Sequence, residues 1–373
     1  MTTGASDTST LLVTGGAGFI GANFVHFWHR RHPGDHIVVL DALTYSGNLA
    51  NISAELEKPN ITFVHGDICD EALAASLFDA HDFDKVVHFA AESHVDRSIA
   101  APDAFVRTNV NGTHSLLKVA LTKWKDKFAG RRFHHVSTDE VYGSLAPDDP
   151  PFTEASPYDP RSPYAASKAA SDFLVRSYGH TYGLPVTISN CSNNYGPYQF
   201  PEKVIPLMVI NALMGRPLPV YGDGLNVRDW IHVEDHCAVL STVLERGRAG
   251  ETYNIGGANE VANIDLVHTL CDLVDARIGR DTELARRFAA CAASHDRRCR
   301  EEIAFVTDRL GHDRRYAIDN SKITREFGSI PTRSLAAGLA DTLNWYIDNE
   351  EWWRLIQSGE YRAWMAKQYG IAV

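Results

Sequence analysis

The sequence predicts an α/β protein with a doubly wound parallel sheet and a second, smaller α/β domain. Three observations support this prediction. Short apolar runs alternate with helical patterns through the first half of the chain, a glycine-rich turn follows the first run, and polar residues stand where later runs end. Helices between successive strands favour a parallel sheet, and ligands bind such sheets at the carboxyl ends of the strands. The expected architecture is therefore of the Rossmann type.

Composition limits the classes of partner. The 373 residues are 44% hydrophobic and 22% charged, as expected for a globular chain of two or perhaps three domains. The opening stretch, MTTGASDTST, lacks the features of a signal peptide, and no apolar run approaches the roughly 20 residues that span a bilayer. A net charge of −11 without a basic stripe argues against nucleic acid as a partner. From the lack of a signal peptide and of a membrane span we expect a cytoplasmic protein. Its six cysteines are scattered along the chain, so we expect reduced, mostly buried thiols.

The first motif is a glycine-rich turn. A predicted strand at residues 10–14 is followed by Gly15, Gly18 and Gly21 with the spacing GxxGxxG, and then by a helical pattern. Glycine lets the backbone approach a pyrophosphate, and the amino-terminus of the helix offers unpaired N–H groups. The strand, turn and helix together predict a dinucleotide site.

The next strand, residues 36–40, ends in Asp41. A carboxylate here accepts hydrogen bonds from a ribose hydroxyl and repels a 2′-phosphate, so NAD is favoured over NADP. The alternative is a turn or capping aspartate. Further strands are expected at residues 61–64 and 85–89, and small residues after the latter, Ala90 and Ala91, allow close approach of a cofactor.

The fifth strand, residues 133–137, runs into Thr138, Asp139 and Glu140. Neighbouring carboxylates take opposite roles when their environments separate their pKa values, so one can donate a proton while the other removes one. This is the chemistry of a dehydration. The alternative is a pair of solvated acids at a strand end.

Tyr164 and Lys168 follow on a helix predicted to begin near Pro163, after a Pro- and Asp-rich surface loop at residues 147–163. The spacing of four places both side chains on one face. A tyrosine titrates near pH 10, and a nearby ammonium together with a positive nicotinamide would stabilise its phenolate as a base. Isolated YxxxK matches arise by chance. The position one step after the fifth strand favours a hydride-transfer role.

The remaining chain changes character after a sixth strand at residues 185–189. We expect a helix in PEKVIPLMVINALMG, a strand in PLPVYGDG, a helix opened by VRDWIHVEDH, and a strand in ETYNIGG. The expected division is a NAD-binding domain at residues 1–195, to which residues 228–256 return, and a nucleotide-sugar-binding domain at 196–373. Tail helices are expected to expose Trp352, Trp353 and Trp364.

Two further groups of residues are candidates for ligand binding. Lys203, Arg228 and Arg309 could hold a diphosphate, since arginine makes bidentate contacts to phosphate and the two arginines are predicted to lie in Gly- and Asp-rich turns. Arg314 and Arg315 are expected to be ordinary surface residues. Cys291, His295 and Cys299 are spaced by four on a predicted helix, as zinc ligands can be. No metal is predicted, because a fourth ligand is missing and arginines surround them.

Taken together, the motifs resemble the nucleotide-sugar branch of the extended short-chain dehydrogenases, and within it the dTDP-glucose 4,6-dehydratase family. The glycine turn and YxxxK indicate the superfamily, whereas STDEVYG and NNYGPYQFPEK are specific to the dehydratases. The resemblance covers the chain from Thr14 to about Asp319. The matching segments are TGGAGFIG, LDALTYSGN, GDICD, AAESHVDRSI, TNVNGT, STDEVYG, SPYAASKAASD, CSNNYGPYQFPEK, YGDGLNVRDWIHVEDH, NIGGANEVAN and DRLGHDRRYAID.

The resemblance implies an NAD-dependent lyase, usually a homodimer, that oxidises carbon 4 of a dTDP-hexose, eliminates water across carbons 5 and 6, and returns the hydride to carbon 6. Tyr164 would be the base, Lys168 would lower its pKa, and Thr138 would hold the 4-hydroxyl. Glu140 would take the proton from carbon 5 while Asp139 protonates the leaving hydroxyl. The implied cofactor-binding residues are Gly15, Gly18, Phe19, Ile20, Gly21, Asp41, Leu43, Thr44, Asp67, Ile68, Ala90, Ala91, Ser93, Thr108, Tyr164, Lys168 and Asn194. The implied substrate-binding residues are Ser93, Thr138, Asn193, Glu202, Lys203, Val204, Pro219, Tyr221, Arg228, Asn263, Arg309 and His312.

The sequence departs from the family pattern at two positions. Leu310 stands where the family usually has proline, and Asn190 where many relatives have arginine. Either change could loosen nucleotide binding. The alternatives are another nucleotide-sugar dehydratase, a 4-epimerase, which has no use for an acid–base pair after Thr138, and a non-catalytic NAD-binding sensor.

Overall fold

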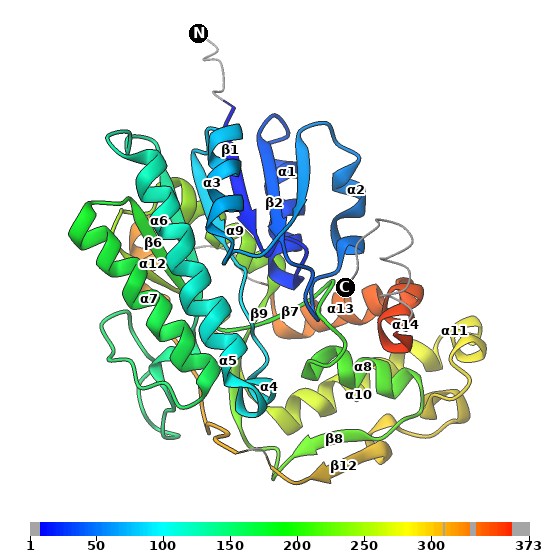
Figure 1. Cartoon of the computed structure of the whole chain (residues 1–373). Helices are drawn as coiled ribbons and strands as arrows, with labels where there is room; N and C mark the ends of the chain where they lie inside the picture. Colours follow the sequence, from blue (N-terminus) through cyan, green and yellow to red (C-terminus); the bar gives the residue numbers. More distant parts are fainter. Residues whose placement is uncertain (1–7, 309, 329–332, 360–373) are drawn as a thin grey trace.

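The structure is a computed structural model that describes residues 8–308, 310–328 and 333–359. Its centre is a seven-stranded sheet in the order β10-β6-β5-β4-β1-β2-β3, with every neighbouring pair parallel (Figure 1). Each of the six strands predicted before residue 192 is present, within two residues of its expected limits. The predicted fold class is confirmed. The strands are β1 (Thr10–Thr14), β2 (His36–Asp41), β3 (Ile61–His65), β4 (Lys85–His88), β5 (Arg132–Thr138), β6 (Val186–Cys191) and β10 (Thr252–Ile255).

Helices cover both faces of this sheet (Figure 1). Along β1, Leu11 and Val13 face one layer and Leu12 faces the other, as the alternation of a strand requires. Because both faces are buried, strands such as β1 and β2 contain continuous apolar runs, whereas β5 and β6 also bury polar side chains. One layer contains α1 (Phe19–Arg31) and α9 (Val233–Arg246), and the other contains α3 (Glu71–Ala80), α6 (Thr113–Trp124) and α7 (Pro163–Tyr182).

A separate hydrophobic core lies in the carboxyl-terminal half and includes Tyr195, Trp230 and Trp353. It is built by α8 (Val204–Leu213), α10 (Asn263–Gly279), α13 (Leu335–Asp348) and α14 (Glu350–Ser358), with α11 (Thr282–Arg287) beside them. Two small sheets accompany these helices. One pairs β8 (Leu218–Tyr221) with β12 (Ile303–Val306), and the other has the order β11-β9-β7, formed by Glu260–Ala262, Val227–His232 and Asn193–Tyr195.

The other elements are short. The α-helices are α2 (Ser53–Leu56), α4 (Val95–Ala100), α5 (Pro102–Phe105) and α12 (Ser321–Phe327), and Val106–Gly112 forms a π-helix. Single 3₁₀ turns occur at Leu49–Ile52, Asp139–Tyr142, Ala292–His295 and Cys299–Glu302. Within the described ranges, no helix combines the length and the apolar character needed to cross a membrane.

Three local predictions are wrong. VRDWIH forms strand β9, and the helix begins only at Val233, where His232 Nδ1 accepts the N–H of Glu234 (3.3 Å). Arg228 therefore lies in a strand and not in a turn. Trp353 is fully buried and Trp352 packs partly buried against the same core, because α14 turns its aromatic face inward. Trp364 lies outside the described residues.

The segment carrying Cys291, His295 and Cys299 is not one helix, because it breaks into two 3₁₀ turns. The two cysteine sulfurs lie 3.8 Å apart in the core, whereas His295 Nε2 turns away to the carbonyl of Ala289 (2.7 Å). Among the described residues, no group of three or more His, Cys, Asp or Glu side chains is placed to hold a metal ion.

Candidate active site

A cavity of about 410 Å³ opens at the carboxyl ends of the central strands, on the edge where ligands bind such sheets. It brings together residues that are far apart in the sequence. The five predicted catalytic residues line it: Thr138, Asp139, Glu140, Tyr164 and Lys168. So do the predicted cofactor-binding residues Gly15, Gly18, Phe19, Ile20, Gly21, Asp41, Thr44, Asp67, Ile68, Ala90, Ala91, Ser93, Thr108 and Asn194.

The glycine-rich turn forms one wall of this cavity. Gly15 has φ +70°, and a Cβ there would lie 2.6 Å from the backbone nitrogen of Ala90. A Cβ on Gly21 would lie 2.2 Å from the carbonyl oxygen of Gly15, so only glycine lets α1 approach β1 this closely. No side chain caps the start of α1 at Gly18, so the backbone N–H groups of the first helical turn have no side-chain partner there. Such N–H groups fit the pyrophosphate of a dinucleotide.

Asp41 ends β2 beside this turn and is almost fully buried. Its two carboxylate oxygens accept the backbone N–H groups of Ala17 (2.9 Å) and Leu43 (2.8 Å). Burial raises the pKa of Asp41, and these two hydrogen bonds oppose that rise. Asp41 therefore does stabilise the local turn, as the alternative interpretation of this residue expected. Each oxygen keeps a second lone pair, so the same carboxylate can also accept a ribose hydroxyl.

Tyr164 and Lys168 lie on α7, which begins as predicted at Pro163 and is capped by Ser162 Oγ (3.0 Å from the Ala165 N–H). Lys168 is buried and donates to the carbonyl of Val136 (2.8 Å). Burial lowers its pKa to about 8. Burial, followed by the nearby Glu140 carboxylate, raises the pKa of Tyr164 well above its ordinary value. The tyrosine is therefore a neutral phenol in the protein alone, and it needs added positive charge to act as a base.

The predicted acid pair occupies the 3₁₀ turn that follows β5. Thr138 caps this turn by accepting the Glu140 N–H (3.3 Å) and donates to Asp139 Oδ1 (3.4 Å). Asp139 is buried, and its Oδ2 has no hydrogen-bond partner among the described residues. Burial, together with repulsion from Glu140 and Asp229, raises the pKa of Asp139 well above its usual range. This shift favours the protonated form of Asp139, which is the form that has a proton to give.

Comparison with known proteins identifies the family. The GDP-mannose 4,6 dehydratase family model matches residues 12–342. The chain is similar to dTDP-glucose 4,6-dehydratases from Salmonella typhimurium, at 49% identity covering 96% of this chain and 98% of that protein, and from Xanthomonas campestris pv. campestris, at 52% covering 95% and 97%. The chain belongs to the dTDP-glucose 4,6-dehydratase family.

Solved structures agree with membership in the dTDP-glucose 4,6-dehydratase family. The enzyme from Bacillus anthracis in complex with NAD superposes with a TM-score of 0.81 at 45% identity, covering 94% of this chain and 100% of that chain. A UDP-glucose 4-epimerase from Thermotoga maritima has a TM-score of 0.78 at 27% identity, covering 91% and 99%. The architecture is thus shared by dehydratases and epimerases, and the site must distinguish between them.

The predicted substrate-binding residues divide into two groups. Ser93, Thr138, Asn193 and Lys203 line the cavity, and Lys203 Nζ donates to the carbonyl of Ser93 (3.4 Å). The others do not line it: Glu202, Val204, Pro219, Tyr221, Arg228, Asn263 and His312. The predicted cofactor residue Leu43 is also outside the cavity, because its side chain points into the core. Arg309 lies outside the described residues.

Arg228 is buried under the ring of Tyr316, with its guanidinium 4.2 Å from the ring centroid. Its guanidinium donates to the carbonyls of Val227 (2.7 Å) and Asp313 (2.9 Å). Its charge lowers the pKa of Asp139, so it lies within electrostatic reach of the acid pair. Tyr221 and His312 meet edge to face, with ring centroids 6.2 Å apart.

The cavity also includes residues that sequence reasoning missed, among them Tyr45, Arg107 and Phe200. The guanidinium of Arg97 lies 3.9 Å from the ring centroid of Tyr45, and Arg107 pairs with Asp67 (2.7 Å). Tyr45 and Phe200 lie within the family motifs LDALTYSGN and CSNNYGPYQFPEK, which was the available signal. The sequence around Arg107 gave no signal for a site residue, because its ion pair with Asp67 joins positions that are far apart in the chain.

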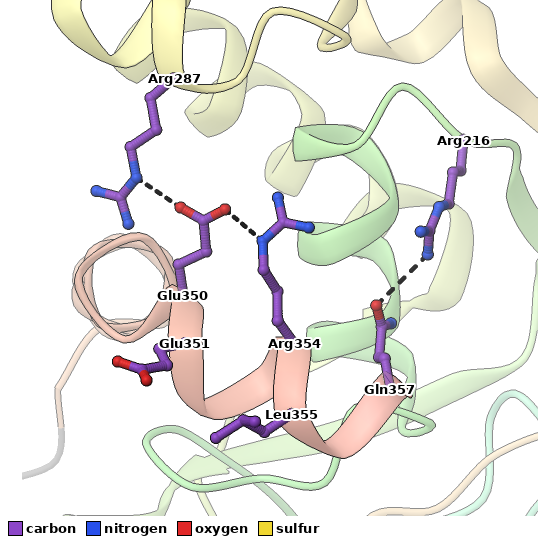
Figure 2. A pocket seen from close by; sticks show the side chains of 7 residues that line it. All are labelled: Arg216, Arg287, Glu350, Glu351, Arg354, Leu355 and Gln357. Atoms are coloured by element: carbon purple, nitrogen blue, oxygen red, sulfur yellow. Dashed lines mark hydrogen bonds and ion pairs between the residues drawn. The ribbon is translucent and has the colours of Figure 1, made fainter. Parts of the chain in front are cut away.

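A second, more open cavity of about 690 Å³ lies beside α14 (Figure 2). Its charged side chains are largely paired. Glu350 bridges Arg287 (2.6 Å) and Arg354 (2.5 Å), and Arg216 reaches Gln357 (3.5 Å), as the dashed lines of Figure 2 show. None of the predicted site residues lines it. We regard it as an ionic network that joins α14 to its neighbours.

Proposed function

We propose that the protein dehydrates dTDP-glucose to dTDP-4-keto-6-deoxyglucose. The observation that carries this proposal is the buried Asp139, whose pKa is raised, beside Glu140 and in the same cavity as Tyr164 and Lys168. A 4-epimerase removes hydrogen at carbon 4 and returns it on the other face, so it needs no acid of this kind. A non-catalytic sensor would need neither pair.

The side chains divide the proton transfers as follows. Thr138 Oγ1 orients the 4-hydroxyl, and Tyr164 removes the hydroxyl proton once positive charge lowers its pKa. Glu140 then takes the proton on carbon 5, which the new 4-ketone has acidified. Asp139 gives its proton to the hydroxyl that leaves carbon 6. The glycine-rich turn and Asp41 would hold NAD, which would supply the redox chemistry as a hydride acceptor for carbon 4 and a hydride donor for carbon 6.

The nucleotide is proposed to lie beyond the cavity, toward β8, β9 and α10. Lys203, Arg228 and Arg309 would hold the diphosphate, and Asn193, Glu202, Val204, Pro219, Tyr221, Asn263 and His312 would surround the nucleoside. Residues 1–195 with 228–256 and residues 196–373 are proposed as the NAD-binding and nucleotide-sugar-binding domains, since their long helices pack into different cores. The short helix α12 is an exception, because its Ile323 packs into the core of the central sheet.

The functional form is proposed to be a cytoplasmic homodimer that pairs through α7. Phe173 and Tyr182 on this helix expose 56% and 53% of their surface, and Val106 nearby exposes 52%. Apolar side chains this exposed favour a partner surface. Size-exclusion chromatography with light scattering should give twice the chain mass, and Phe173→Glu should yield monomer.

Incubation with dTDP-, UDP- and GDP-glucose tests the activity. We expect the 4-keto-6-deoxy product from dTDP-glucose, with solvent deuterium incorporated at carbon 5. Product from another nucleotide would make the protein a different nucleotide-sugar dehydratase. A 4-epimer without deuterium exchange would show an epimerase and would refute the role given to Asp139.

A further inference from the structure

Behind the active site, α7 carries a buried carboxylate that the proposed mechanism does not use. Tyr164, Lys168 and Asp172 are spaced by four, so they lie in one row along the helix. Asp172 is fully buried. A buried charge on this row, one turn beyond the catalytic lysine, must be compensated by its surroundings.

A single histidine joins this carboxylate to the lysine. His135 Nε2 lies 3.3 Å from Lys168 Nζ and 3.2 Å from Asp172 Oδ1, and neither the His135 nor the Asp172 side chain reaches solvent. The other carboxylate oxygen, Asp172 Oδ2, accepts hydrogen bonds from Ser137 Oγ (2.8 Å) and Tyr158 OH (2.9 Å). These donors fix the carboxylate so that Oδ1 points at the histidine.

The ionisable groups around Lys168 leave Asp172 as its anionic partner. Burial keeps His88 and His135 neutral by lowering their pKa values far below 6.5, and it keeps Cys191 a thiol by raising its pKa to about 12. Tyr158 is also held neutral by burial, and it receives a hydrogen bond from Arg176 (2.7 Å). The groups that face the pair are His88 on β4, His135 on β5, Asn190 and Cys191 on β6, Asp139 and Glu140 after β5, Tyr158 before α7, and Tyr164 and Arg176 on α7.

We propose that Asp172 is a positioning residue for the oxidation step: its carboxylate, which lies on the other side of His135 Nε2 from Lys168 Nζ, holds Lys168 electrostatically in the charged form that Tyr164 needs. The proposal rests on the function proposed above. The electrostatics agree with it. After burial, Asp172 is the largest influence on the pKa of Lys168 and raises it, opposing the fall to about 8. The pKa of Asp172 is raised by burial to about 6, so the carboxylate is ionised at pH 7 and above.

Asp172→Asn tests the proposal, because the amide keeps the shape of the side chain and removes its charge. The pKa of Lys168 should fall, so Lys168 loses its proton at lower pH. In single-turnover formation of reduced nicotinamide, the alkaline limb of the pH profile should move from about pH 8 to lower pH by roughly 1–3 units, the range for an opposite charge at this separation. Ser171→Ala, a buried neighbour on α7 that carries no charge, should leave the limb in place.

Two further measurements keep the test decisive. Tyr158→Phe removes one donor from Asp172 but keeps the carboxylate, so it should give a smaller shift in the same direction and decides the question if Asp172→Asn does not fold. The pKa of Lys168 itself, followed by NMR of its isotopically labelled side chain in the protein without substrate, should be lower in Asp172→Asn than in the parent.

A folded Asp172→Asn protein whose alkaline limb and Lys168 titration match the parent would overturn the proposal. If the parent itself forms neither reduced nicotinamide nor product with any hexose, the proposed function fails instead. The Lys168 titration still decides the role of Asp172 in that case, since it requires no substrate.

Discussion

Asp139→Asn is the substitution that most directly tests the acid–base assignment. Asp139 is 2% exposed and its pKa is raised well above 3.8, which favours the uncharged acid as the parent side chain. Asparagine is also uncharged and has nearly the same shape. The substitution therefore removes a transferable proton without changing the charge beside Glu140 and Tyr164.

The expected loss of rate in Asp139→Asn is that of removing a general acid. Loss of a general acid costs about 10²–10⁴-fold, or roughly 2.7–5.5 kcal/mol of transition-state stabilisation, in the elimination step alone. Oxidation at carbon 4 should proceed within a few-fold of the parent rate. The variant should accumulate bound reduced nicotinamide, seen by its absorbance in stopped flow, while 4-keto-6-deoxy product falls.

The pH profile of the oxidation step gives the decisive control. An ionised Asp139 would raise the pKa of Tyr164, as the structure indicates for a charge at this position. Removing such a charge would shift the acid limb of the profile to lower pH. An unshifted acid limb supports the neutral acid, whereas a shifted limb, or product formed at the parent rate, would refute the reasoning.

Four other predictions can be tested. Glu140→Gln should oxidise substrate but lose deuterium exchange at carbon 5, with product reduced by about 10²–10⁴-fold; exchange at the parent rate would exclude Glu140 as the base. Arg228→Ala should weaken binding of dTDP-glucose by about 1.5–3 kcal/mol in calorimetry, with NAD affinity unchanged, and equal substrate affinity would contradict a diphosphate role. Purified protein should carry bound NAD and turn over many equivalents of substrate without added cofactor, because the reaction is redox-neutral; a stoichiometric requirement for fresh NAD would argue against this. The stability of Asp139→Asn relative to the parent should rise as pH increases above about 4, the unfolded-state pKa of an aspartate, because the raised folded-state pKa makes the parent lose stability there. Thermal melts that stay parallel across this range would contradict the raised pKa.

The sequence alone determined the sheet and most of the chemical identity of the site. Strands β1, β2 and β4 contain short apolar runs, and the glycine-rich turn excludes larger residues, since a Cβ at Gly21 would collide with the carbonyl oxygen of Gly15. Local patterns of this kind need no knowledge of distant residues. Tyr164 and Lys168 could be paired for the same reason, because four residues on a helix fix their relative direction.

The protonation of the buried site residues depends on the tertiary structure. Asp139 is an acid and not a solvated carboxylate because burial and the approach of Asp229, ninety positions along the chain, raise its pKa. The connection from Lys168 through His135 to Asp172 needs β5 to pack against α7. Arg228 fell in a buried strand because β9 pairs with β7 and β11, and the sequence carries no local mark of that pairing. Desolvation and long-range pairing are properties of the packed molecule, so no window of sequence contains them.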